Sequence, residues 1–379
     1  MSNNKDFKVK NGIQPTVYHE GLGTVTTGTN TASLDLATGS VFELTPTEDV
    51  TVSITNPAAS GTVSQATLLL DGVSISTYDL ANAVYDNVSY TVTTGPNGLF
   101  FKPDGTRVYV IGFSDDAIRE YSLSTAWDIS TASYVQVFSV ATRELFPQGL
   151  FFKPDGTKMY VVGSVGDDVN EYDLSTAWDI STATYLQLFS VATQETAPSD
   201  LFFKPDGTKM YVLGYTGDDV NEYDLSTAWD VSTATYLQNF SVAAQDTHPN
   251  GLFFKPDGTA MYVVGTGNVV DEVNEYALST AWDVSTASYV QEFSLTMAGP
   301  QGLFFKPDGT KMYVIDSSSS AIYQYSTDAL ATITYDTAIT WSGGTAPTSP
   351  AIGETDVLTF GTRDGGTTYQ DVLAIDGAQ

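Results

Sequence analysis

The sequence predicts an all-β protein in which a five-bladed β-propeller is inserted into a split antiparallel β-sandwich. Three observations carry this prediction. The string Phe-Phe-Lys-Pro-Asp-Gly-Thr occurs five times, with its Lys at positions 102, 153, 204, 255 and 306. A second string, Leu-Ser-Thr-Ala-Trp-Asp, places Trp127, Trp178, Trp229 and Trp282 at nearly the same spacing. Strand-like segments flank the repeat on both sides, and neither flank has enough strands to bury a core alone.

Each repeat unit contains four short predicted strands. In the second unit they are residues 149–153, 158–162, 169–173 and 185–191. The Pro-Asp-Gly turn between the first two suits a hairpin, because Pro presets φ at the second turn position and Gly accepts a positive φ. Four strands at a period of about 50 residues are typical of a propeller blade. No run of apolar residues has the 3.6-residue spacing of a helical repeat.

Strand counting predicts how the ring of blades closes. The fifth unit, residues 302–325, has three strands and lacks the fourth. Residues 87–92, ahead of the first unit, supply the missing strand, and a ring closed in this way has no open edge. An incomplete sixth blade that uses residues 74–80 as a lone strand is the alternative.

The repeated Trp-Asp pair is interpreted as structural. We expect each Trp to pack between two blades and the following Asp to fix the next turn. The Asp residues of the Pro-Asp-Gly turns are expected to serve their hairpins rather than a metal ion.

The flanking segments predict one further domain. Strand-like runs occupy residues 33–36, 40–44, 50–54, 65–70, 331–335, 356–360 and 369–373. Together they make about seven strands, the number of a small antiparallel sandwich. The predicted organisation is an N-terminal segment (1–29), a split sandwich (30–72 with 331–379) and a propeller (73–330).

Composition excludes several functions. The 379 residues include 45 Asp+Glu and 15 Lys+Arg, a formal charge of −30, which disfavours nucleic acid and anionic membranes as partners. There is no Cys, and the two His are His19 and His248, so neither a thiolate site, a His-rich metal centre nor a Ser-His-Asp triad is expected. The polar start lacks the apolar run of a signal peptide, and no stretch is long enough to span a membrane.

Comparison between the units predicts one face as a recognition surface. With the strands of a unit lettered A to D, the A–B and C–D connections are nearly identical in every unit, whereas the B–C and D–A connections differ. The two sets lie on opposite faces of a propeller, and the sandwich is expected to attach to the uniform face. The candidate binding residues in the variable loops are Phe113, Asp115, Asp116, Phe146, Asp167, Asp168, Tyr215, Asp218, Asp219, His248 and Asp271. Loop drift without a function is the alternative.

Neither a cofactor nor catalysis is expected. Paired acids such as Asp167 and Asp168 offer oxygen ligands to Ca²⁺, but solvated loop charge is the commoner explanation, so no metal ligand is assigned. The innermost strands contain Leu-Phe-Phe-Lys in all five units, and Asp200 is the one acidic departure at their rim. A glycoside hydrolase needs two carboxylates, so the sequence predicts a protein that is not an enzyme.

The two flanking segments contain six distinctive motifs, at residues 34–36, 42–51, 56–61, 339–347, 353–360 and 364–369. Through these motifs, residues 30–72 joined to 331–379 resemble a C-terminal module common in bacteriophage tail fibres and related virion proteins. Residues 7–12 are similar to the start of many marine phage fibre proteins. The repeat with Ala-Trp-Asp-Ile-Ser-Thr-Ala resembles propellers of phage and aquatic bacterial proteins without assigned chemistry. The inserted propeller departs from the plain module, in which the two halves run on directly.

This resemblance implies a virion structural protein. The leading function is host attachment, as a tail fibre or receptor-binding protein; a head-decoration or head-fibre protein is the alternative, and a polysaccharide-degrading enzyme is a distant third. The implied partners are other virion proteins, through the N-terminal segment and sandwich, and a host-surface glycan or protein, through the variable loops. A homo-oligomer is implied, with a trimer as one form. The expected location is the tail or head exterior, after synthesis in the host cytoplasm without a signal peptide.

Overall fold

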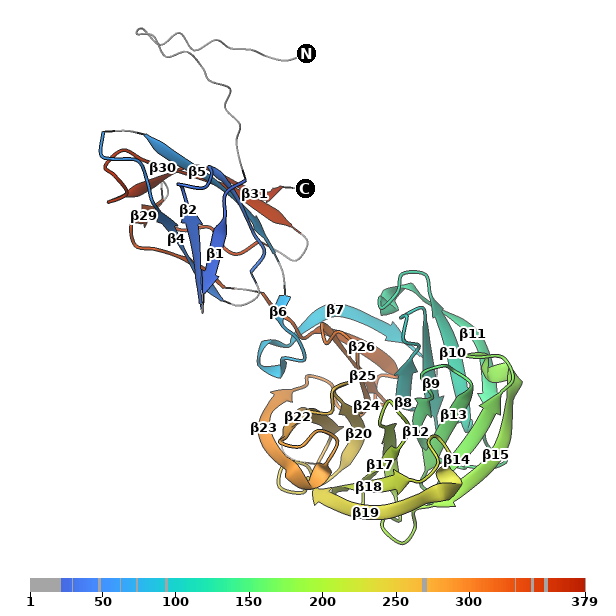
Figure 1. Ribbon diagram of the computed structural model, residues 1–379. Coiled ribbons are helices and arrows are strands. Elements are labelled where there is room, and N and C mark those ends of the chain that lie inside the picture. The colour runs from blue at the N-terminus through green and yellow to red at the C-terminus, as the bar shows by residue number, and fades with distance from the viewer. Residues whose placement is uncertain are drawn as a thin grey trace. The chain divides into compact units, whose positions relative to one another are not determined.

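The computed structural model describes residues 22–28, 30–46, 49–61, 63–72, 74–92, 95–267, 271–330, 332–341, 344–350 and 354–378. The chain divides into two compact units (Figure 1). One spans residues 76–328, and the other combines the chain up to residue 75 with the chain from residue 329. Most of the predicted N-terminal segment lies outside the described residues.

The unit formed by residues 76–328 is a five-bladed β-propeller, as predicted. Within the described residues it contains five four-stranded antiparallel sheets, with the first strand of each repeat unit at the centre and the last at the rim (Figure 1). The blades comprise β8 (Pro96–Phe101), β9 (Arg107–Gly112), β10 (Ala117–Leu123) and β11 (Ala132–Ser139); β12 (Pro147–Phe152), β13 (Lys158–Gly163), β14 (Asp168–Leu174) and β15 (Ala183–Ser190); β16 (Pro198–Phe203), β17 (Lys209–Gly214), β18 (Asp219–Leu225) and β19 (Ala234–Ser241); β20 (Pro249–Phe254), β21 (Ala260–Gly265), β22 (Glu272–Leu278) and β23 (Ala287–Ser294); and β24 (Pro300–Phe305), β25 (Lys311–Asp316), β26 (Ala321–Ser326) and β7 (Val84–Thr91).

The ring closes through β7, which confirms the predicted closure. This strand precedes the first blade in the sequence, yet it pairs antiparallel with β26, from Ala321↔Thr91 to Ser326↔Val84. The alternative of a sixth blade is wrong, because β6 (Ser74–Ser76) forms a two-stranded ladder with β27 (Ala329–Leu330) instead. The outer edge of the last blade is therefore occupied by a strand from the start of the repeat region.

Each Trp of the repeat packs between two blades, as predicted. The Trp178 ring stacks on Phe152 at 5.5 Å, while the hydroxyl of Tyr109, in the preceding blade, donates to the Trp178 carbonyl at 2.6 Å. A Cβ at Gly156, in the Pro-Asp-Gly turn, would collide with the Trp178 ring, so this turn needs Gly for space as well as for its φ of +73°. Asp179 accepts from the Ser181 N–H at 3.0 Å and fixes the next turn.

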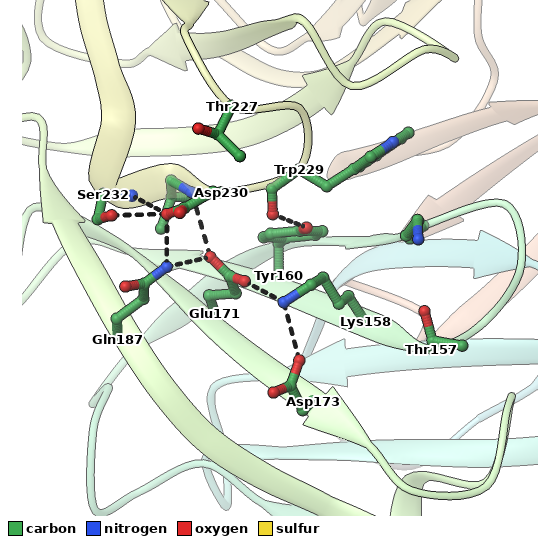
Figure 2. Close-up of polar contacts among 12 residues, drawn as sticks. Thr157, Lys158, Tyr160, Glu171, Asp173, Gln187, Thr227, Trp229, Asp230 and Ser232 are labelled. Carbon is green, nitrogen blue, oxygen red and sulfur yellow. Dashed lines mark hydrogen bonds and ion pairs between the residues drawn. The ribbon is translucent and has the colours of Figure 1, made fainter.

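Buried polar groups also latch successive blades together (Figure 2). The Glu171 carboxylate is fully buried, pairs with Lys158, and accepts from Gln187 Nε2 at 2.9 Å within its own blade. It also accepts from the Val231 N–H of the next blade at 3.1 Å, and Gln187 donates onward to Asp230 of that blade at 2.7 Å. The next pair of blades repeats the latch through Glu222, Gln238, Val284 and Asp283. The polar positions of the repeat therefore join blades.

The second unit contains two sheets around one hydrophobic cluster. The four-stranded sheet has the order β1 (Val25–Gly28), β2 (Thr31–Asp35), β4 (Val50–Thr55) and β28 (Ile333–Tyr335). The five-stranded sheet has the order β29 (Ile339–Thr340), β31 (Tyr369–Ala378), β30 (Thr355–Thr362), β5 (Ser64–Asp71) and β3 (Val41–Leu44). Side chains of both sheets, including Leu34, Val52, Phe42, Leu68 and Phe360, share the cluster.

Two details of the predicted sandwich are wrong. The pairing is mixed rather than antiparallel, since β2 and β28 both run parallel to β4, β3 runs parallel to β5, and β29 to β31. From β2 to β5 the strands alternate between the two sheets, so β3 is the crossover that brings β4 parallel to β2. In addition, β1 pairs with β2 as part of the sheet, although residues 25–28 were predicted to belong to the N-terminal segment.

Candidate functional site

The variable loops of the propeller surround a pocket of about 530 Å³. The residues that line it are Asn97, Phe113, Phe146, Gln148, Ser164, Ala197, Pro198, Ser199, Tyr215, Asn250, Thr266, Gln301 and Ser317. They come from all five blades and from the B–C and D–A connections or the start of the innermost strands. The convergence of the variable loops, expected from the strand order, is thus present in the structure.

Two sets of equivalent positions build most of the pocket. Asn97, Gln148, Ser199, Asn250 and Gln301 are each the second residue of an innermost strand. Phe113, Ser164, Tyr215, Thr266 and Ser317 each follow directly after the second strand of a blade. Because the repeat places these positions at the same point in every blade, they meet around the propeller axis.

The lining is uncharged in the described part of the chain, although the protein has a formal charge of −30. Its polar groups are amides and hydroxyls. The side-chain amide of Asn97 uses one N–H to donate to the Pro147 carbonyl at 2.9 Å, and Asn250 donates in the same way to the Pro300 carbonyl at 3.0 Å. These bonds run to the next blade and orient each amide, which has further donors and acceptors for a ligand.

Aromatic side chains form the exposed part of the lining. The rings of Phe113 and Phe146 stack at 6.3 Å, and 40% and 53% of these residues are exposed. Tyr215 is 42% exposed and packs against His248 at 5.2 Å. Exposed rings in a pocket offer apolar faces to a ligand.

A plug of five Phe rings closes the propeller axis below the pocket. Each blade contributes the fifth residue of its innermost strand, and neighbouring rings meet edge to face. The centroid separations are 5.1 Å for Phe100–Phe151, 5.2 Å for Phe151–Phe202, 5.4 Å for Phe202–Phe253, 5.5 Å for Phe253–Phe304 and 5.3 Å for Phe304–Phe100. The void among them is about 10 Å³, no more than one water molecule needs. The pocket is therefore blind rather than the mouth of a channel.

The structure brings three of the predicted binding residues, Phe113, Phe146 and Tyr215, into the pocket lining. The acidic candidates take part in the conformation and hydrogen bonding of the loops instead. Asp116, Asp167 and Asp218 adopt a left-handed φ of +48°. Asp168 and Asp219 accept from the side chains of Asn170 and Asn221, respectively.

Two acidic candidates remain. The Asp115 side chain pairs with Arg119, and the backbone carbonyl of Asp271 accepts from the Leu295 N–H at 2.7 Å. Among the described residues, no group of three or more His, Cys, Asp or Glu side chains could hold a metal ion.

Three buried carboxylates that the sequence analysis missed position the loops. Glu195, in a D–A connection, accepts from the Ala197 N–H at 2.6 Å and from the Gly217 N–H of the neighbouring B–C loop at 2.8 Å. Glu144 and Asp246 occupy the equivalent positions in their blades and accept from the N–H groups of Val165 and Gly267. Their equal spacing in the repeat was the available signal.

One further acid lies between the pocket and the Phe plug. Asp200 follows the pocket residue Ser199 and lines the void among the Phe rings. It is buried, and burial raises the pKa of its carboxyl to about 7 although the Leu252 and Leu201 N–H groups lower it.

Comparison with known proteins shows no family for this chain. No family model matches the chain, and no curated protein matches it. A provisionally named 6-phosphogluconolactonase from Bacteroides fragilis is similar at 14% identity and a TM-score of 0.40, over 85% of this chain and 84% of its own. The periplasmic gluconolactonase PpgL of Pseudomonas aeruginosa is similar at 15% identity and a TM-score of 0.39, over 76% of this chain and 71% of its own. The propeller domain of Myceliophteria thermophila Cps50 (Swd1) matches at 11% identity and a TM-score of 0.39, over 63% of this chain and 99% of its own.

These similarities correct one prediction. The sequence analysis predicted that the chain is not an enzyme, yet similar structures carry the names of lactonases, which are enzymes. The prediction is wrong because it considered glycoside hydrolases alone, and the lack of a carboxylate pair does not exclude other reactions on a propeller fold. In the described part of the chain, no helix has the length and apolarity of a membrane span.

Proposed function

We propose that the pocket on the variable-loop face binds a neutral carbohydrate. The observation that carries this proposal is the lining itself, which combines amides and hydroxyls with exposed aromatic rings and has no charged side chain among the described residues. Sugar hydroxyl groups pair with amide and hydroxyl groups, and the C–H faces of a sugar ring pack on aromatic faces. A charged ligand would lack a counter-charge in such a pocket.

We further propose that the chain is a virion protein that attaches to a host-surface glycan through this pocket. The support is the resemblance of residues 30–72 and 331–379 to the tail-fibre module, in which the two sheets of the second unit would be a β-sandwich split by the propeller. On this proposal the module and the N-terminal segment contact other virion proteins. Display of several copies would let individually weak sugar contacts add up to firm attachment.

Binding of the full chain to an array of host-surface glycans tests the carbohydrate proposal. We expect retention on neutral glycans, and about tenfold weaker binding after Phe146→Ala or Tyr215→Ala. Tyr134→Ala is the matched control, because Tyr134 is 52% exposed on β11 and does not line the pocket. Unchanged binding by both pocket variants would contradict the proposal, and release of reducing ends would identify an enzyme acting on the bound glycan.

Immunogold labelling of intact virions with antibody to the propeller tests the location. Label at the tail tip or its fibres is the expected result. Label over the head would favour the alternative, a head-decoration protein, and virions without label would overturn the virion assignment.

A further inference from the structure

Asp200 occupies a position that is Gly in the other four blades, namely Gly98, Gly149, Gly251 and Gly302. Those glycines lie where neighbouring innermost strands approach each other. A Cβ at Gly251 would lie 2.5 Å from the Gln301 carbonyl oxygen and 2.9 Å from the Gly302 Cα. The presence of the Asp200 side chain at this crowded level of the axis therefore has to be explained by contacts that the other four blades lack.

The backbone around the Asp200 side chain presents N–H groups toward the axis. Directly after β16, the Lys204 N–H donates outward to the Lys209 carbonyl. Because successive residues of a strand direct their N–H groups to opposite edges, the Leu201 N–H, three residues earlier, points inward, away from β17. The Asp200 carboxylate accepts this N–H at 2.8 Å and the Leu252 N–H of the next blade at 2.8 Å.

All five blades share this arrangement. The bond equivalent to that of Lys204 recurs at Lys102, Lys153, Lys255 and Lys306. The N–H groups of Leu99, Leu150 and Leu303 therefore also lie on the inner edge of their strands. Five inward N–H groups at one level form a ring of donors around the axis.

The Asp200 carboxyl lies in uncharged surroundings. On one side, the described residues of the pocket lining include no charged side chain. On the other side, the void is lined by Leu and Phe in addition to Asp200 itself. The two hydrogen bonds of the carboxylate run to backbone N–H groups and to no cation. Clusters of oriented backbone N–H groups are favourable sites for anions.

We propose that the ring of inward N–H groups is an anion site for a small carboxylate, and that Asp200 fills it from within the chain. Replacement of Asp200 by Gly, the residue of the other four blades, opens this site to a free carboxylate of similar size. The inference does not depend on carbohydrate binding, and neither result bears on the other.

Formate is the probe, because it is the smallest carboxylate. Thermal unfolding of the full chain at pH 8 is measured at increasing concentrations of sodium formate. For Asp200→Gly we expect a saturable rise in Tm of about 4 °C at ten times the dissociation constant. The wild-type chain, whose site is filled, is expected to lack this saturable rise, and ¹³C-formate resonances are expected to broaden with the variant alone.

Two further variants separate the site from general effects. Asp206→Ala removes one negative charge from the same blade at the exposed Pro-Asp-Gly turn, and it should respond to formate like the wild type. Asp200→Asn keeps the space filled and loses one acceptor, so it should be less stable and gain nothing from formate. An equal response of Asp200→Gly and Asp206→Ala would overturn the proposal. If Asp200→Gly has to be refolded, equal refolding yields with and without formate would overturn it as well.

Discussion

Acidic side chains in the variable loops bind the backbone next to them. Paired Asp residues in three loops would suggest a calcium site from the sequence. In the structure, Glu195 and Asp246 accept backbone N–H groups that would otherwise be left unpaired inside the loops. Asp116 and Asp167 take left-handed conformations, which Asp tolerates better than most residues. At the residue scale, negative charge thus shapes the loops, while uncharged groups line the pocket.

The buried carboxyl of Glu144 makes stability depend on pH. Burial raises the pKa of Glu144 from 4.5 to about 7. Between these values the folded chain holds a proton that the unfolded chain releases, so the free energy of unfolding falls as pH rises. Glu144→Gln should reduce this loss between pH 4.5 and 7 by about 1–2 kcal/mol, measured by urea unfolding at each pH.

Asp155→Asn is the control for this pH effect. Burial raises the pKa of Asp155, but hydrogen bonds from Lys153 and Thr157 outweigh it and hold the pKa at about 2. Its contribution to stability is lost only at more acid pH, so the pH slope between 4.5 and 7 should match the wild type. A wild-type slope in Glu144→Gln would show that Glu144 does not hold the proton.

At the element scale, the Trp rings and the polar latch are two of the contacts that join neighbouring blades. The latch spans three side chains of one blade and reaches the next blade through a backbone N–H and Asp230 (Figure 2). Propeller blades bury their faces against their neighbours, so contacts between blades decide whether the ring stays closed. The latch therefore explains why Glu, Gln and Asp recur in the repeat.

Loss of the latch carboxylate should destabilise the propeller strongly. Glu171→Ala leaves Lys158 and the Val231 N–H without their buried partner, at a cost of about 3–5 kcal/mol. Asp173→Ala removes the other, half-exposed partner of the same Lys158 and should cost less than about 1 kcal/mol. Urea unfolding followed by Trp fluorescence measures the loss of unfolding free energy in each variant. Equal losses would mean that the buried Glu171–Lys158 pair stabilises the propeller no more than the half-exposed pair does.

At the scale of the whole molecule, closure of the ring depends on a strand that is distant in the sequence. Ser89 in β7 and Tyr323 in β26 are register partners 234 residues apart. Val137 and Arg119 are the equivalent partners in the first blade and lie only 18 residues apart. The two pairs share their geometry and differ in the length of chain that each one closes.

An engineered disulfide at each pair tests how much chain entropy is lost when the two strands are brought together. The chain has no Cys of its own, so no native thiol interferes. Oxidation of Ser89→Cys with Tyr323→Cys should stabilise the chain by about 2 kcal/mol more than oxidation of Arg119→Cys with Val137→Cys. Comparison of oxidised and reduced forms by urea unfolding measures each gain. Equal gains would indicate that the unfolded chain already keeps β7 near β26.

Much of the propeller could be predicted because its signals are local and repeated. The Pro-Asp-Gly turns mark each hairpin, the Trp-Asp pair marks each C–D connection, and the missing strand of the fifth unit points to residues 87–92. The second unit was harder to predict, since alternation of strands between two sheets makes neighbours such as β2 and β4 parallel. Short strands carry no local signal of their direction of pairing.

The repeat, the blade count, the closing strand and the variable face can all be predicted from the sequence. Which of the variable residues meet depends on how the blades pack. Asn97, Gln148 and Ser164 join Phe113 and Tyr215 because five equivalent positions converge on one axis, and that convergence cannot be read from any single unit. The same convergence places Asp200 among inward N–H groups and leaves the paired acids outside the pocket. Spacing in the chain predicts which positions are equivalent, whereas packing around the axis determines what each position can contact.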